Sequence, residues 1–135
     1  MMKRKIKEFS KAEVGAFGEK TCVKYLKQNG YKILDRNSKI GHLETDIIAY
    51  NKTHIVFAEV KTRRINMKNS SRPSSAVDKN KQNNLIIFAK AYIKYLPEKL
   101  KEKQLRIDVC EILVHQDKNK LKTSDLNYIE GAISR

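Results

Sequence analysis

The alternation of apolar and polar residues predicts a β-hairpin near the middle of the chain. Residues 44–50 (ETDIIAY) and 55–62 (IVFAEVKT) are rich in β-branched and aromatic side chains, which favour strands. The polar residues 51–54 between them have the usual length of a hairpin loop. The pattern therefore predicts two antiparallel strands joined by a short connection.

The register of this hairpin would bring acidic residues together. If Tyr50 pairs with Ile55, Asp46 lies opposite Glu59, and such partners have Cβ atoms about 4.5–5.5 Å apart. Side chains alternate between faces, so Glu59 and Lys61 share one. Two close carboxylates repel unless a proton or a metal ion lies between them. A divalent cation with a neighbouring lysine suits phosphodiester hydrolysis, and a solvated strand face with a surface ion pair is the alternative.

A long helix is predicted before the hairpin. Ser10 and Glu13 form a capping box, in which each side chain satisfies a free backbone N–H group at the helix start. The helix is expected over about residues 11–28. It should end at Asn29 and Gly30, which are typical of a C-terminal cap.

Glu19 lies within the apolar seam of this helix. The seam consists of Ala12, Ala16, Val23 and Leu26. A charged carboxylate on an apolar face is costly, so Glu19 needs a lysine, a proton or a metal ion as partner. Gly15 and Gly18 carry no side chain, so the sheet or a ligand could approach the helix closely. A role in the site and a salt bridge at the edge of the seam both stay open.

A second helix is expected after the hairpin, from a capping box at residues 75–78 to Pro97. Its buried stripe is predicted to contain Val77, Leu85, Phe88, Tyr92 and Tyr95. Lys81 lies on this stripe near its N-terminal end, with Gln82 beside it. The lysine either reaches out to the surface or points into the same site as Glu19, where Lys81 and Gln82 would contact nucleic acid.

Two further strands are predicted, over residues 31–38 and 106–114. Residues 117–135 are expected to form a polar turn and a short irregular or helical end. The order α-β-β-β-α-β predicts an α/β fold, in which a small mixed sheet is flanked by helices. With 135 residues and 40% hydrophobic content, residues 1–135 have the size and composition of a single domain with its own core.

The chain is strongly basic, with 29 Lys and Arg against 15 Asp and Glu and a formal net charge of +14. This balance favours a polyanionic partner, either nucleic acid or an anionic membrane surface. Residues 1–9 form a basic lead-in, and residues 63–75 are predicted to be a mobile basic loop. The candidate phosphate contacts in this loop are Arg63, Arg64, Lys68 and Arg72. A plain linker on a uniformly basic surface is the alternative.

The remaining composition argues for a cytoplasmic protein. Cys22 and Cys110 are far apart and belong to no cluster with metal-ligand spacing, which favours free thiols in a reducing compartment. The three histidines are scattered, so the sequence has no zinc pattern. No apolar run of about 18 residues is present to span a membrane, and no apolar segment follows the basic start.

Six short motifs occur in order along the chain. They are Gly15-x-x-Gly18-Glu19, Gly30-Tyr31-x-Ile33-Leu34-x-Arg36-Asn37, Glu44-x-Asp46-Ile47-Ile48-Ala49, Val56-Phe57-x-Glu59-Val60-Lys61-Thr62-Arg63, Val77-x-x-x-Lys81-Gln82 and Arg106-x-Asp108-Val109. Together they resemble the YraN-like family of small bacterial proteins, which is related to Holliday-junction resolvases within the PD-(D/E)xK nuclease superfamily. The resemblance covers about residues 12–133.

This resemblance implies a restriction-endonuclease-like core and a metal-dependent endonuclease that acts on DNA, including branched or structured DNA. By analogy, Asp46, Glu59 and the main-chain carbonyl of Val60 would hold Mg²⁺ or Mn²⁺. Glu19 would complete the metal shell from the first helix. Lys61 would position or activate the attacking water.

Two other functions are compatible with the same sequence. A non-catalytic nucleic-acid-binding protein with a nuclease-like fold would bind without divalent metal and would not cleave. An interaction protein, for example on ribosomal RNA, would depend on its charge alone. DNA is the favoured partner, with RNA as the alternative, and both a monomer and a homodimer fit the sequence.

Overall fold

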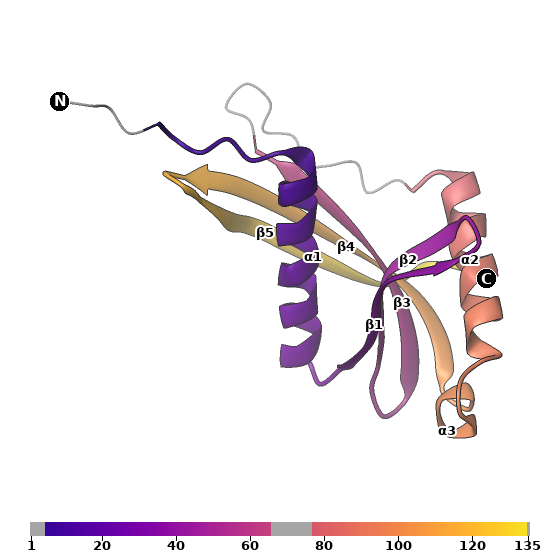
Figure 1. Cartoon of the computed structure of the whole chain (residues 1–135). Helices are drawn as coiled ribbons and strands as arrows, with labels where there is room; N and C mark the ends of the chain where they lie inside the picture. The colour runs from indigo at the N-terminus through magenta and orange to yellow at the C-terminus, as the bar shows by residue number, and fades with distance from the viewer. Residues whose placement is uncertain (1–4, 66–76, 135) are drawn as a thin grey trace.

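The computed structural model describes residues 5–65 and 77–134, and Figure 1 shows their arrangement. The elements follow in the order α1 (Lys11–Gln28), β1 (Lys32–Ile40), β2 (Leu43–Tyr50), β3 (His54–Arg64), α2 (Lys79–Ile93), α3 (Glu98–Lys101), β4 (Gln104–Asp117) and β5 (Lys120–Ile133). The predicted α/β class is confirmed, because the described strands form a mixed sheet flanked by helices. This architecture is compatible with a restriction-endonuclease-like core.

Within the described residues, the strands lie in the order β1-β2-β3-β4-β5 across the sheet. β1, β2 and β3 are antiparallel neighbours, and β4 and β5 also pair antiparallel. β3 and β4 are parallel, because the chain leaves β3 and returns to the start of β4 after passing through α2 and α3. Parallel neighbours require such a crossover, and α2 forms most of the part of it that the structure describes.

Each face of the sheet carries its own apolar cluster. Leu26 of α1 belongs to one cluster together with Cys110 of β4, and Phe88 of α2 belongs to the other together with Ile107 of β4. The two helices therefore cover opposite faces of the sheet (Figure 1). Cys110 and the equally buried Cys22 are free thiols, as predicted.

The first helix begins and ends where the sequence predicts. The Ser10 hydroxyl accepts a hydrogen bond from the Glu13 N–H at 3.1 Å, and the Glu13 carboxylate accepts one from the Ser10 N–H at 3.1 Å. Asn29 is the C-terminal cap, and Gly30 follows with φ of 87°, a conformation that glycine adopts without strain. The capping box and the cap thus confirm both boundaries.

The central hairpin has the predicted register. Tyr50 pairs with Ile55, and the pairing continues as far as Ile47 opposite Ala58. The two clusters also confirm the alternation of faces along β2, because Ile47 belongs to the cluster under α1 and Ile48 to the cluster under α2.

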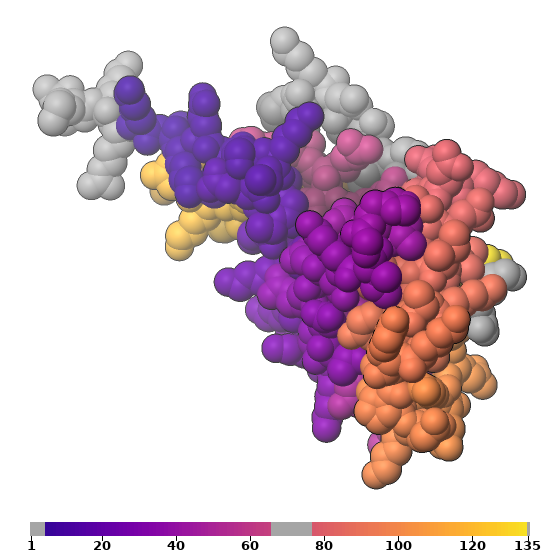
Figure 2. Space-filling model, turned by 45° about the vertical axis from the view of Figure 1, so that its right-hand side comes forward, coloured from indigo at the N-terminus to yellow at the C-terminus, as the bar shows by residue number. Residues whose placement is uncertain are grey.

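Beyond the pair of Ile47 and Ala58, β2 and β3 separate. β2 remains paired with β1 as far as Leu43, while β3 continues beside β4. In Figure 1 the far end of the β1–β2 hairpin turns toward α2, and Figure 2 shows its surface against that helix. We call this separation the fork, and Asp46 of β2 and Glu59 of β3 are the first residues past it.

The C-terminal part of the chain differs from the prediction. Lys120–Ile133 form β5, paired antiparallel with β4, where an irregular or helical end is expected from the sequence. Polar residues dominate this strand and hide its alternation. Leu126 and Tyr128 nevertheless pack on the apolar cluster under α1, which explains why the segment is a strand.

The second helix is shorter than predicted. Asp78 is its N-cap and accepts a hydrogen bond from the Lys81 N–H at 2.8 Å, whereas Ser75 of the predicted capping box lies outside the described residues. The helix ends at Ile93 instead of reaching Pro97, so Tyr95 lies beyond it and is 84% exposed. The prediction that Tyr95 belongs to the buried stripe is therefore wrong.

The predicted start of the basic loop over residues 63–75 is wrong. Arg63 and Arg64 belong to β3, because their backbones pair with β4. Lys68 and Arg72 lie outside the described residues. Among the residues that the structure describes, no helix is both long and apolar enough to cross a membrane.

Candidate active site at the strand fork

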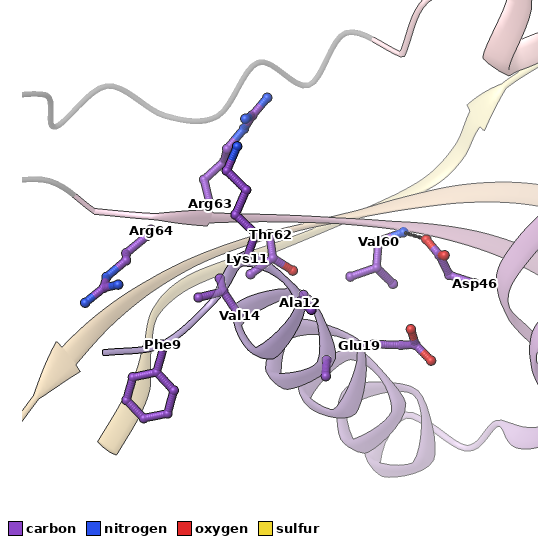
Figure 3. Close-up of a pocket in the computed structure, with 12 residues that line it drawn as sticks. Phe9, Lys11, Ala12, Val14, Glu19, Asp46, Val60, Thr62, Arg63 and Arg64 are labelled. Carbon is purple, nitrogen blue, oxygen red and sulfur yellow. Dashed lines mark hydrogen bonds between the residues drawn. The ribbon is translucent and has the colours of Figure 1, made fainter. Parts of the chain in front are cut away.

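The fork exposes a backbone N–H group that Asp46 satisfies. The Oδ2 atom of Asp46 accepts a hydrogen bond at 2.8 Å from the N–H of Val60 on the opposite strand. In a continuing antiparallel ladder that N–H would bond to the backbone of β2. The side chain of Asp46 thus spans the gap between the separating strands, and Figure 3 shows this contact.

Glu59 lies beside Asp46 at the fork and is nearly buried. Its side chain is only 12% exposed, and its Oε1 atom lies 3.6 Å from the ammonium nitrogen of Lys81 on α2. Its second oxygen, Oε2, is buried with no hydrogen-bond partner in the described structure. Burial, followed by the negative charge of Asp46, raises the pKa of Glu59 to about 7, although Lys81 acts in the opposite direction.

The pKa of Asp46 is also raised. Burial is the largest cause, and the nearby charges of Glu19 and Glu44 add to it, whereas the Val60 N–H and Lys81 lower the value. The two carboxylates therefore hold less negative charge near neutral pH than two free acids would. A cation placed between the two carboxylates would offset their repulsion and favour the ionised form of both.

α1 reaches the fork because a glycine allows it to approach β3. A Cβ atom added at Gly18 would overlap the Thr62 hydroxyl and lie 2.8 Å from the Thr62 Cβ, so a larger residue would push helix and strand apart. At Gly15, by contrast, an added Cβ atom would have no described atom within 4 Å. The predicted close approach is thus confirmed at Gly18, where the partner is the sheet.

Glu19 follows Gly18 and is held by two residues of β1. Its Oε1 atom lies 3.3 Å from Arg36 Nε and accepts a hydrogen bond at 2.9 Å from Asn37 Nδ2. Asn37 has φ of 49°, in the left-handed region that asparagine tolerates better than most residues. The salt bridge considered for Glu19 is therefore present, with an arginine, and the same carboxylate is close enough to Asp46 to raise its pKa.

A cavity of about 820 Å³ opens between α1, the fork and the end of β3. It is lined by Phe9, Lys11, Ala12, Val14, Gly15, Ala16, Glu19, Asp46, Val60, Thr62, Arg63 and Arg64. In Figure 3 the carboxylates of Asp46 and Glu19 lie at one end, and Arg63 and Arg64 lie toward the other. One end of the cavity can thus hold a cation, and the other can hold an anion.

The donor set at the fork fits a hard divalent cation. No three His, Cys, Asp or Glu side chains of the described residues are grouped so as to bind a metal by themselves. Mg²⁺ nevertheless commonly uses one or two carboxylates and completes its shell with water and substrate. Asp46 and Glu59 supply two carboxylates. The Oε2 atom of Glu59 has no hydrogen-bond partner in the described structure, so it could coordinate a cation. The residues present therefore fit Mg²⁺ or Mn²⁺.

The other predicted site residues have different positions. Lys61 lies two residues after Glu59 on β3, and its backbone is in register with Glu111 of β4. Lys81 points toward the fork, where it forms an ion pair with Glu59. Of its two predicted positions, the surface and the site, this is the second. The side chain of Gln82 instead donates to the Val77 carbonyl at 2.7 Å, which fixes the start of α2.

Three residues that shape the site have no role assigned to them by the sequence analysis. Arg36 and Asn37 lie within the strand predicted over residues 31–38, and only the packing of α1 beside β1 brings them to Glu19. Thr62 stands next to Lys61, but its role is to meet Gly18 across the helix–sheet contact. Gly18, directly before Glu19, was the available signal for this contact. The apolar seam predicted around Glu19 is only partly present, because Val23 and Leu26 are buried whereas Ala12 and Ala16 are exposed.

Comparison with known proteins gives consistent matches. The model of the uncharacterised protein family UPF0102 matches residues 18–112. A UPF0102 protein of Caldanaerobacter subterraneus subsp. tengcongensis is 39% identical over 127 residues, covering 94% of this chain and 99% of that protein. A UPF0102 protein of Clostridium perfringens is 35% identical over 127 residues, covering 94% and 98%. One of Syntrophomonas wolfei is 39% identical over 109 residues, covering 81% and 91%.

Proposed function

The chain belongs to the uncharacterised protein family UPF0102, which is the YraN-like family, and from the site at the fork we propose that it is a metal-dependent nuclease. The reaction is hydrolysis of phosphodiester bonds, with DNA as the favoured substrate. Branched or otherwise structured DNA is the preferred class, by the likeness of the YraN-like family to Holliday-junction resolvases.

The carboxylate pair of Asp46 and Glu59 is the observation that carries this proposal. Both groups are largely buried at the point where two strands separate, and burial raises the pKa of both. The negative charge of Asp46 raises the pKa of Glu59 further. Such an arrangement is unfavourable for folding alone, since a buried charge without full pairing costs free energy. Strained carboxylate pairs of this kind are typical of sites that bind a cation or move a proton.

The residues at the fork divide the chemistry between them. Asp46, Glu59 and the carbonyl of Val60 would hold Mg²⁺ or Mn²⁺, and Glu19 would support it from α1. The cation, when bound, supplies Lewis-acid activation of water and of the phosphate. Lys61 shares the strand face of Glu59, and its ammonium group would orient the attacking water and stabilise the charge that develops on the phosphate.

The opposite end of the cavity supports the choice of a phosphodiester substrate. Lys11, Arg63 and Arg64 line it, in the same cavity as Asp46 and Glu19. The planar guanidinium group of arginine can donate two parallel hydrogen bonds to phosphate oxygens. A backbone bound there would place a neighbouring phosphate beside the fork.

Cleavage assays with the purified protein test this proposal. Linear duplex, flapped and four-way-junction DNA are incubated with Mn²⁺, Mg²⁺ or EDTA, and the products are resolved by electrophoresis. We expect cleavage with Mn²⁺ or Mg²⁺ and none with EDTA. Asp46→Asn, purified in the same way, controls for contaminating nucleases and should be inactive. If wild-type protein cuts no substrate with either metal, the proposal is wrong.

A second candidate is a nucleic-acid-binding protein that does not cleave. The ion pair between Lys81 and Glu59 favours it, because an ammonium group already compensates one of the two carboxylates. This function predicts equal DNA affinity in Mn²⁺ and EDTA and no cleavage. The same assays, run with a parallel binding measurement, distinguish the two candidates.

A further inference from the structure

A second cavity, of about 810 Å³, lies along the outer side of α1, and we call it the α1 groove. It is lined by Phe17, Lys20, Thr21, Val23, Lys24, Lys27, Gln28, Arg36 and Thr123. Among these described residues there is no carboxylate, so the groove carries the charge of three lysines beside Arg36, which pairs with Glu19. The site at the fork makes no use of these lysines.

The three lysines form a regular row. Lys20, Lys24 and Lys27 are spaced by four and three residues, so they occupy one side of the helix, and all three are exposed. At about 1.5 Å per residue, the row extends roughly 10 Å along the helix axis. Along the duplex axis each strand has one phosphate per about 3.4 Å, so the row has the length of about three successive phosphate spacings.

The α1 groove is connected to the candidate active site by an ion pair. Arg36 lines the groove, and its Nε atom lies 3.3 Å from Glu19, which lines the cavity at the fork. An extended polyanion could thus pass from one cavity to the other along a single helix. In Figure 3 the side chain of Glu19 leaves α1 toward the Asp46 end of the first cavity.

We propose that the α1 groove binds the phosphodiester backbone of a nucleic acid on the segment that flanks the fork, with Lys20, Lys24 and Lys27 as the phosphate contacts. The choice of nucleic acid as the occupant rests on the proposed function. An anionic membrane is the competing partner for a basic helix, but membrane-surface helices also present exposed apolar side chains. The most exposed large apolar residues described, Ile6, Ile65, Ile87 and Tyr95, all lie outside the groove.

A matched pair of triple variants tests this inference. Lys20, Lys24 and Lys27 are changed to glutamine in one variant, and Lys90, Lys94 and Lys99 in the other. The second set removes the same charge from exposed positions in and around α2, on the opposite face of the sheet. Arg36 is left unchanged so that Glu19 keeps its partner. Thermal unfolding of both variants verifies that exposed substitutions leave the fold intact.

Affinity for a labelled duplex is measured by fluorescence anisotropy in EDTA over a range of salt concentrations. Each phosphate contact contributes about 0.9 to the slope of log affinity against log salt. The groove variant should lose about 2 to 3 from this slope, and the control variant should lose clearly less. On a duplex too short to extend beyond the fork, the groove variant should match wild type.

Equal losses in the two triple variants would overturn the inference, because net charge alone would then explain the binding. It would also be overturned if the groove variant lost binding to phosphatidylglycerol vesicles while it kept its DNA affinity. Binding is measured without cleavage, so the two proposals can fail separately. A reduced slope without cleavage in any metal would refute only the nuclease activity.

Discussion

The carboxylate of Asp46 on β2 accepts the backbone N–H of Val60 on β3 at 2.8 Å, across the fork where the two strands separate. This contact replaces one rung of the backbone ladder with a side chain. It also fixes the carboxylate beside Glu59, whose buried Oε2 atom has no hydrogen-bond partner in the described structure. Asp46 therefore has two functions at the fork: it satisfies the Val60 N–H group, and with Glu59 it forms a pair of acids that favours a bound cation.

Glu59→Gln should change the pH dependence of stability in the metal-free protein. The folded-state pKa of about 7 lies above 4.5, the ordinary pKa of a glutamate, so the folded protein binds this proton more tightly than the unfolded chain. Ionisation of Glu59 therefore destabilises wild type as the pH rises from about 4.5 to about 7. The full effect is about 3 kcal/mol, at about 1.4 kcal/mol for each pKa unit.

Urea unfolding of wild type and Glu59→Gln in EDTA measures this effect. The variant should gain stability relative to wild type above pH 7 and lose that advantage below pH 4.5. A difference in unfolding free energy that stays constant over this range would show that Glu59 does not titrate as described.

Gly18→Ala should weaken the contact between α1 and β3. An added Cβ would overlap Thr62, and such overpacking typically costs about 1–3 kcal/mol of stability. Gly15→Ala is the matched control on the same helix, since its Cβ would meet open space. Alanine there should stabilise the helix by up to about 1 kcal/mol.

The free energies of unfolding of the two glycine variants check this prediction. Cleavage by Gly18→Ala should also fall, because α1 carries Glu19 toward the fork. Equal stability of the two alanine variants would contradict the tight packing of Gly18 on Thr62.

Much of this arrangement could be predicted from the sequence, because it depends on local signals. The capping box at Ser10 and the cap at Asn29 set the bounds of α1, and the four-residue connection after Tyr50 sets the hairpin register. The expected partnership of Asp46 and Glu59 follows from that register alone.

The remaining features depend on contacts between distant segments. The ladder between β2 and β3 ends at the fork because the β1–β2 hairpin packs on α2, and no local pattern encodes this. β5 is too polar to be recognised as a strand until it pairs with β4. Arg36 meets Glu19 only because α1 lies over the sheet beside β1.

Glu19→Gln separates the structural role of this carboxylate from its role at the site. Its ion pair with Arg36 is partly solvated, since the Arg36 side chain is 45% exposed, so its loss should cost under about 1 kcal/mol. The variant should bind Mn²⁺ more weakly, as measured by calorimetry. A large drop in thermal stability with unchanged Mn²⁺ affinity would assign Glu19 to the fold alone.

Lys61→Ala should reduce turnover by about 10²-fold while DNA affinity changes little, because its ammonium group acts mainly on the transition state. Lys61→Arg should not restore activity, since a planar guanidinium does not replace a compact ammonium group. Single-turnover cleavage rates and anisotropy are measured for both variants. Wild-type turnover in Lys61→Arg would refute the catalytic role, and restored binding without cleavage would favour the non-catalytic candidate.

The most direct measurement of the central claim is a calorimetric titration of Mn²⁺ into wild type, Asp46→Asn and Glu44→Gln above pH 7. Asparagine keeps an oxygen that can accept the Val60 N–H, so the fold should be retained while a metal ligand is lost. Glu44 is an exposed acid two residues away on β2, and its substitution controls for the loss of one charge. We predict one Mn²⁺ site in wild type and Glu44→Gln and none in Asp46→Asn. Equal Mn²⁺ binding by Asp46→Asn, or no binding by wild type, would contradict a metal site at the fork.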